Sequence, residues 1–165
     1  MDGVATPSFC IDVYREIYAN QTYNDYFYTD LSLAPLTPAG PMGSPAATDI
    51  KKLWAAYYPV ASVNNQDAAA LQVAIWEDIA ANVGTYSITV SGNDPVTNEA
   101  ANMLSNLDNL AAQADLQGLV SPDGQNYVVP VPDTEPVPEP TTAGCFLFGL
   151  GVLACFQRFT QNRCS

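Results

Sequence analysis

The sequence predicts an α+β protein, in which a small antiparallel sheet with two or three packed helices precedes a Pro-rich stalk and a C-terminal transmembrane helix. Several short segments alternate apolar and polar residues as strands do, and longer segments repeat apolar residues at helical spacing. The end of the chain joins prolines to an uncharged apolar run with a basic end. We expect a folded domain at 1–129, a Pro-rich linker at 130–142 and the transmembrane helix at 143–165.

Four segments have the pattern of strands. Residues 8–14 alternate their faces and place Cys10 on the more polar one. Residues 23–31 and 85–90 are rich in the aromatic and β-branched residues that favour strands. Residues 119–129 supply a last strand across a Pro-Asp-Gly turn. Strands this short and this separated suit a small antiparallel sheet.

The first predicted helix follows a loop at 33–45 that is rich in Pro and Gly. Ser44 is a good N-cap, and Pro45 is favoured at the first helical position because its missing N–H would have no helical partner there. We expect this helix to run to about Tyr58, because Pro59 disfavours helical backbone in the residue before it.

Two further helices are predicted by caps and by apolar spacing. Asn64 or Asn65 caps a helix at 66–82, and Gly84 ends it. Asp-Pro at 94–95 opens a third helix, which we expect to extend to about Leu116. The apolar stripe of the second helix consists of Leu71, Ile75 and Ile79.

The net charge and the lack of histidine exclude some classes of function. The residues before Thr141 hold all 17 acidic residues and only three basic ones, a net charge of −14. Such a field repels nucleic acid, so no nucleic-acid partner is expected. Histidine is absent, which removes the commonest general base and metal ligand. We expect no metal, no cofactor and no enzyme with turnover.

The C-terminal part of the chain consists of three physically different pieces in succession. The first piece is a glutamate flanked by prolines, which cannot become part of a helix. The second is an apolar run without a polar face. The third is a basic end, which stops transfer of the chain through the membrane. By the positive-inside rule the basic end stays cytoplasmic and the domain faces outward. The three pieces are Pro138-Glu139-Pro140, the apolar run 143–156, and the basic residues Arg158 and Arg163.

This order of motif, apolar helix and basic end resembles the PEP-CTERM sorting signal of Gram-negative exported proteins. The resemblance implies export, retention in the inner membrane as a precursor, and processing by an exosortase-type membrane protease near the Pro-Glu-Pro. The product would reach the cell surface or the extracellular matrix. The alternative is an ordinary C-terminal membrane anchor on a Pro-rich stalk.

The start of the chain and its cysteines bear on export. Met1-Asp2-Gly3-Val4 has no basic start and no apolar run, so no signal peptide is recognisable, and we expect that some N-terminal sequence is missing. The other three cysteines belong to the tail, which leaves Cys10 alone in the domain. A single unpaired thiol is unusual in a protein exported to an oxidising compartment, so we expect Cys10 to have a specific role.

Two short motifs lie within the first 85 residues, Phe9-Cys10-Ile11-Asp12 and Leu71-Gln72-Val73-Ala74-Ile75-Trp76. They resemble the paired motifs of the thioester domains of Gram-positive surface adhesins. In that family an aromatic-Cys-apolar strand lies against a Gln-x-Ala-apolar-Trp helix. The Cys sulfur and the Gln carbonyl carbon join with loss of ammonia.

The resemblance implies that Cys10 supplies the sulfur, Gln72 the acyl group, and Trp76 a shield against water. A cysteine thiolate is strongly nucleophilic, and the thioester it would form is an activated acyl group that an amine can attack. The protein would then attach covalently to an amine-bearing surface or matrix partner.

Ordinary structural roles are the alternative to this chemistry. Cys10 can be a small buried apolar residue, Gln72 a solvated helix residue and Trp76 part of the core. The protein would then be a noncovalent structural or carbohydrate-binding component of the exopolysaccharide or biofilm layer, with its tyrosines stacking on sugars. Asp12, with Arg15 and Glu16, is expected to form surface pairs worth less than about 1 kcal/mol.

Overall fold

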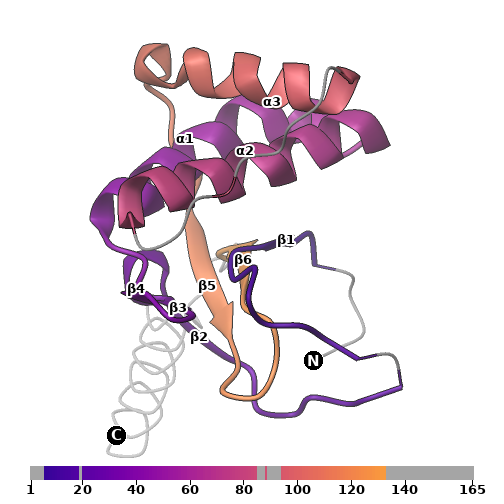
Figure 1. Cartoon of the computed structure of the whole chain (residues 1–165), viewed down its shortest axis with the longest axis vertical. Helices are drawn as coiled ribbons and strands as arrows, with labels where there is room; N and C mark the ends of the chain where they lie inside the picture. The colour runs from indigo at the N-terminus through magenta and orange to yellow at the C-terminus, as the bar shows by residue number, and fades with distance from the viewer. Residues whose placement is uncertain (1–5, 19, 85–87, 89–93, 133–165) are drawn as a thin grey trace, which may run out of the picture. The chain divides into compact units, whose positions relative to one another are not determined.

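The folded part of the chain is an α+β domain with a small antiparallel sheet and three helices, as the sequence predicts (Figure 1). This computed structural model describes residues 6–18, 20–84, 88 and 94–132. The chain up to Val131 forms one compact unit. Within the described ranges no helix has the length and apolar character that a membrane crossing needs. The predicted stalk beyond Pro132 and the predicted transmembrane helix lie outside the described residues.

The main sheet has the strand order β1-β6-β5-β2, and each neighbouring pair is antiparallel. Its strands are β1 (Phe9–Cys10), β2 (Phe27–Asp30), β5 (Leu116–Val120) and β6 (Tyr127–Pro130). A second sheet pairs β3 (Pro35–Leu36) with β4 (Gly40–Pro41). The order sets β1, from the start of the chain, beside β6, from the end of the domain. Cys10 is therefore fixed opposite Tyr127.

The helices pack together on one side of the strands, with α2 between α1 and α3 (Figure 1). They are α1 (Ser44–Ala61), α2 (Asn65–Val83) and α3 (Pro95–Ser105), and short 3-10 helices span Leu31–Leu33 and Leu107–Asn109. The core joins all three helices to the sheet. Its largest fully buried members include Ile11, Leu31, Ile50, Leu53, Leu71, Ile75, Ile79, Val120 and Val128.

The prediction for α2 is confirmed at both ends and along its apolar stripe. The Asn64 side chain caps it by accepting a hydrogen bond from the backbone N–H of Gln66 at 2.9 Å. Gly84 ends it with φ +67°, a left-handed conformation that glycine adopts without strain. The Leu71-Ile75-Ile79 stripe is buried. Because Gln72 and Trp76 each follow a stripe residue, they emerge at the border of the buried face.

The other two helices differ from their predicted ends. Pro59 lies inside α1, which continues to Ala61, and Gly43 rather than Ser44 is the N-cap. Burial of Ala61 at the end of this helix favours continuing past Pro59. Asp94 caps α3 as predicted, accepting from the N–H of Val96 at 2.8 Å. The helix ends at Ser105 rather than near residue 116, because the chain must turn to enter β5.

The predicted alternation over residues 8–14 is wrong. Only Phe9 and Cys10 form a strand, and Cys10, Ile11 and Asp12 are all buried. The chain bends after Cys10, with the Arg15 N–H donating to the carbonyl of Asp12 at 3.3 Å. The expected pairing of Asp12 with Arg15 forms, with Arg15 Nε 3.7 Å from Asp12 Oδ2, but it is not a surface pair, because Asp12 is only 1% exposed.

The remaining predicted strands are confirmed in part. β2 occupies the end of the predicted segment 23–31. The single last strand expected at 119–129 is instead the hairpin of β5 and β6, with the Pro-Asp-Gly segment in its turn. Apart from residue 88, the strand predicted at 85–90 lies outside the described residues.

Candidate functional site

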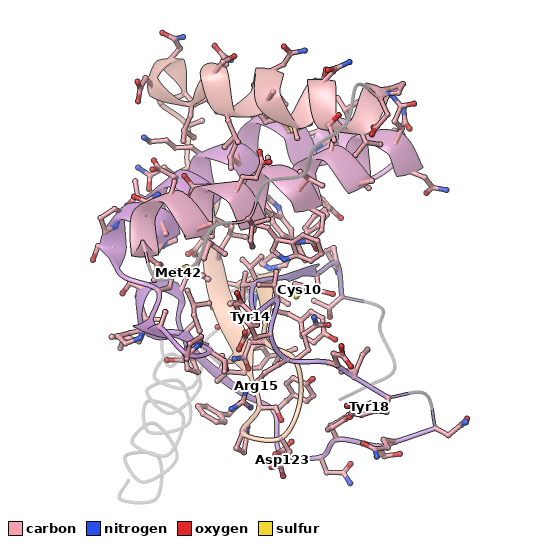
Figure 2. The ribbon with its side chains drawn as sticks, in the orientation of Figure 1. Cys10, Tyr14, Arg15, Tyr18, Met42 and Asp123 are labelled. Atoms are coloured by element: carbon pink, nitrogen blue, oxygen red, sulfur yellow. The ribbon has the colours of Figure 1, made fainter. Side chains whose placement is uncertain are left out.

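Cys10 ends β1 at the edge of the main sheet, just under the helices (Figure 2). Its side chain is buried, with the residue 8% exposed. The position is held from two sides, because β1 pairs with β6 and the next residue, Ile11, donates its N–H to the carbonyl of Asn126 at 3.0 Å. The thiol is thus carried on a fixed backbone.

The structure brings Gln72 of α2 into direct contact with Cys10. The Cys10 backbone N–H donates to Gln72 Oε1 at 2.9 Å, and Gln72 Nε2 donates to the Cys10 carbonyl at 2.8 Å. Both ends of one carboxamide are therefore bound to one residue that lies 62 positions away in the chain. This pairing fixes the orientation of the amide, because exchanging its oxygen and nitrogen would break both hydrogen bonds.

This pairing has a chemical consequence. A hydrogen bond to Gln72 Oε1 polarises its carbonyl and would stabilise negative charge that develops on that oxygen during attack on the carbonyl carbon. The donor is the backbone N–H of Cys10, the residue that carries the potential nucleophile. The contacts of Gln72 are with the backbone of Cys10, whereas the carboxamide that contacts the Cys10 sulfur is that of Gln125.

Three residues other than Gln72 surround the sulfur, namely Asp12, Trp76 and Gln125. The Cys10 thiol contacts the carbonyl of Asp12 at 3.5 Å, and Gln125 Nε2 donates to Sγ at 2.7 Å. Burial raises the pKa of Cys10, and the Asp12 carboxylate adds to this, while hydrogen bonds with the Asp12 backbone and the Trp76 indole oppose it. The thiol is thus protonated at rest, but donors to the thiolate are already in place.

Trp76 lies beside the thiol, one helical turn after Gln72. Its indole N–H is buried and makes no hydrogen bond of ordinary geometry in the described part of the chain. The sulfur is the group that this N–H influences, by lowering the pKa of Cys10. The predicted site residues Cys10, Gln72 and Trp76 are therefore gathered at one place, although the bond and its shielding stay predictions.

Aromatic rings pack on the other side of β1. The Phe9 ring meets Trp54 edge-on at a centroid distance of 5.3 Å and Tyr58 at 6.5 Å. Trp54 and Tyr58 stack on each other at 4.7 Å. This cluster ties β1 to α1 and limits movement of the strand against the helices.

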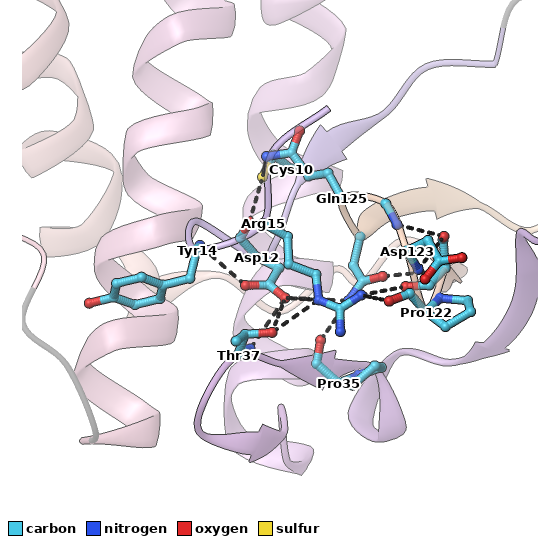
Figure 3. Close-up of polar contacts among 12 residues, drawn as sticks. Cys10, Asp12, Tyr14, Arg15, Pro35, Thr37, Pro122, Asp123 and Gln125 are labelled. Atoms are coloured by element: carbon cyan, nitrogen blue, oxygen red, sulfur yellow. Dashed lines mark hydrogen bonds and ion pairs between the residues drawn. The ribbon is translucent and has the colours of Figure 1, made fainter. Parts of the chain in front are cut away.

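A buried polar network holds the bend that follows Cys10 (Figure 3). Asp12 Oδ2 accepts from the backbone N–H of Thr37 at 3.2 Å and from its hydroxyl at 3.0 Å. Arg15 Nε lies 3.7 Å from the same carboxylate oxygen, and its Nη1 donates to the carbonyls of Ser121 at 2.9 Å and of Pro122. The network joins the bend to the β5–β6 turn, which carries Gln125.

Two of these residues were not predicted as parts of the site. Gln125 follows the Pro-Asp-Gly turn and has no motif of its own, and only the pairing of β6 with β1 brings it to the sulfur. Asp12 lies next to the Cys motif, but its burial depends on Thr37 and Asn126, which lie far along the chain.

The remaining predicted sites have different outcomes. Among the residues the structure describes, no three His, Cys, Asp or Glu side chains lie close enough to hold a metal ion. The sorting motif Pro138-Glu139-Pro140 and the basic residues Arg158 and Arg163 lie outside the described residues. Comparison with protein-family models, curated proteins and solved structures found no match.

Proposed function

We propose that this chain is an exported surface or matrix protein that forms an internal thioester between Cys10 and Gln72 and uses it to attach to an amine. The observation that supports this most strongly is the carboxamide of Gln72 held by both its ends on the backbone of Cys10. A glutamine that was only solvated on the helix surface would not make this pair of hydrogen bonds.

The chemistry balances without any cofactor or redox partner. The Cys10 sulfur attacks the Gln72 carbonyl carbon, the C–N bond breaks, and ammonia leaves with the thiol proton. An external amine later attacks the same carbon, the C–S bond breaks, and the proton passes from nitrogen to sulfur. The product is a substituted amide at Gln72 and a free Cys10 thiol.

The charge of the domain indicates the kind of amine. With a net charge of −14 before Thr141, the protein attracts cationic partners and repels anionic ones. Lysine-rich protein surfaces and amino sugars carry amines in such a setting. Sorting by an exosortase-type protease through the C-terminal PEP-CTERM-like signal would deliver the domain to the cell surface, where these partners occur.

A noncovalent carbohydrate-binding function is the second candidate. It is favoured by exposed aromatic residues, because Tyr14 is 56% and Tyr18 61% exposed on the segment that follows β1 (Figure 2). Phe27 and Tyr28 on the edge strand β2 are also more than half exposed. Exposed aromatic rings can stack on sugar rings without any reaction at Cys10.

Amine labelling separates the two functions. The chain is incubated with methylamine at neutral pH and its peptides are analysed by mass spectrometry. We expect methylamine on Gln72, none on Gln66, which is exposed on the same helix, and none in a Cys10→Ala variant. Absence of label on Gln72, or equal labelling in Cys10→Ala, would contradict the thioester and leave the noncovalent function.

A further inference from the structure

A groove lies at the edge of the main sheet, where β2 ends beside α1. Its larger part is a hollow of about 430 Å³, and the side chains that line it include Tyr28, Asp30, Lys51, Asp115 and Gln117. A smaller hollow of about 200 Å³ shares Asp30 and Lys51 and continues along α1. The two hollows together are called the β2 groove.

The β2 groove is lined mainly by polar side chains, which disfavours an apolar ligand. The carboxylates of Asp30 and Asp115 accept hydrogen bonds, and the Lys51 ammonium donates them. The amide of Gln117 does both. The smaller hollow adds three hydroxyls and a second amide, those of Ser32, Ser44, Thr48 and Gln113. A ligand that matches this lining carries many hydroxyl or amine groups.

Among the described lining residues, Tyr28 supplies the aromatic ring. It is 51% exposed on the edge strand. Asp30 follows two residues later on the same face of the sheet, and Gln117 lies opposite Asp30 on β5. The apolar face of a sugar can stack on such a ring while its hydroxyls bond to the polar groups beside it. The lining therefore suits a saccharide.

Asp30 is held in place as an acceptor. Its Oδ1 accepts from the backbone N–H of Ser32 at 2.8 Å and from the Ser32 hydroxyl at 2.6 Å. These hydrogen bonds, and more weakly the charge of Lys51, lower the pKa of Asp30, so the group is ionised at neutral pH. Among the residues that the structure describes, Lys51 forms no ion pair, whereas Lys52 is paired with Asp49 at 3.1 Å.

The charge of the β2 groove selects the kind of sugar. Two carboxylates and one ammonium give it a net charge of 1 − 2 = −1, in a chain with a net charge of −14 before Thr141. An acidic sugar is repelled, whereas a protonated sugar amine is attracted and can form charge-assisted hydrogen bonds. We infer that the β2 groove binds a polysaccharide of amino sugars, with a sugar ring on Tyr28 and an ammonium group paired with Asp30 and Asp115.

This binding is separate from the reaction at Cys10. The strands β5 and β6 lie between β2 and β1 in the sheet. Three strand spacings of about 4.8 Å make about 14 Å, so a sugar in the groove leaves the thiol uncovered. The inference therefore does not rest on the proposed thioester, and it adds a noncovalent site for an amine-bearing partner.

Binding is measured by isothermal titration calorimetry at pH 6 on the full chain carrying Cys10→Ala, in which no thioester can form. The probes are a glucosamine tetramer and its fully N-acetylated form. We expect the glucosamine tetramer to bind at least about tenfold more tightly, because acetylation removes the charge that the two carboxylates recognise. Absence of binding, or equal affinity for the two probes, would overturn the inference.

Matched substitutions separate the β2 groove from the general acidity of the domain. Asp115→Asn and Asp108→Asn remove the same charge at exposed positions, but only Asp115 lines the groove. Tyr28→Ala and Tyr14→Ala each remove an exposed ring, and only Tyr28 lines the groove. We expect the groove variants to bind glucosamine about tenfold more weakly and the control variants to change less than about twofold. An equal loss within either pair would contradict the assignment.

A lysine peptide tests whether the sugar itself is recognised. Trilysine amide has four ammonium groups, as the glucosamine tetramer does, but no sugar ring to stack on Tyr28. We expect it to bind about tenfold more weakly and to be insensitive to Tyr28→Ala. A peptide that binds as tightly as the sugar would show that the groove recognises cationic amines alone, and the inference would be wrong. Labelling of Gln72 by methylamine in the unsubstituted chain decides the thioester independently.

Discussion

Asp78 is a buried carboxyl group on α2, and its replacement by Asn should stabilise the domain in a pH-dependent way. The residue is 5% exposed. Its Oδ1 accepts from Asn82 Nδ2 at 3.1 Å, whereas Oδ2 is buried with no hydrogen-bond partner in the described part of the chain. Burial, and then the nearby charge of Asp49, raise the pKa of Asp78 to about 7 against the weaker opposing effect of Lys52.

The sign and size of the effect follow from linkage. In the unfolded chain an Asp loses its proton near pH 4, so between about pH 4 and pH 7 the folded state binds more protons than the unfolded state. The free energy of unfolding therefore falls as pH rises through this window and levels off above it. A shift of about three units corresponds to at most roughly 4 kcal/mol, and we expect about 2–4 kcal/mol.

The free energy of unfolding is measured by urea denaturation of a truncated chain that ends at Asp133, at pH 4.5 and at pH 8. Asp78→Asn should unfold with nearly the parent's free energy at pH 4.5, because the carboxyl is then neutral in the folded protein. At pH 8 it should be more stable by about 2–4 kcal/mol. Asp108→Asn, at an exposed position, is the control and should change little at either pH. A difference between Asp78→Asn and the parent that does not change with pH would refute the reasoning.

Two other predictions concern the bend after Cys10 and the tail. Asp12→Ala should lower the free energy of unfolding by about 3–5 kcal/mol, because it leaves Arg15 and the N–H of Thr37 without their buried partner; a loss below about 1 kcal/mol in urea unfolding would contradict this. Replacing Pro138 and Pro140 by Ala should leave membrane insertion intact but block processing in a cell that has the sorting protease. Normal release of that double variant, seen by fractionation and immunoblotting, would show that the Pro-Glu-Pro is only a stalk.

Local signals explain which helix features could be predicted. The helix α2 is defined by its N-cap Asn64, its apolar stripe and its C-cap Gly84. All of these lie in or next to the helix itself, so a local sequence pattern is enough to predict it. Pro59 does not end α1, because its local penalty is outweighed by packing at the end of the helix, which no local pattern reports. The class of fold was predictable for the same reason that α2 was.

Contacts between distant segments explain what could not be predicted. The bend after Cys10 depends on Asn126 and Thr37, and a strand pattern over residues 8–14 cannot report them. Gln125 reaches the sulfur only through the register of β6 with β1. The meeting of Cys10 with Gln72 was expected from a resemblance to known motifs, not from their spacing in this chain.

The mass of the intact, freshly purified chain at neutral pH tests the thioester most directly. Formation of the Cys10–Gln72 bond expels ammonia, so the parent should be lighter than its sequence by about 17 Da. Cys10→Ala and Gln72→Ala should each have the full mass of their own sequences. A parent with its full sequence mass would contradict the account, and the contact between Cys10 and Gln72 would then be a structural hydrogen-bond pair alone.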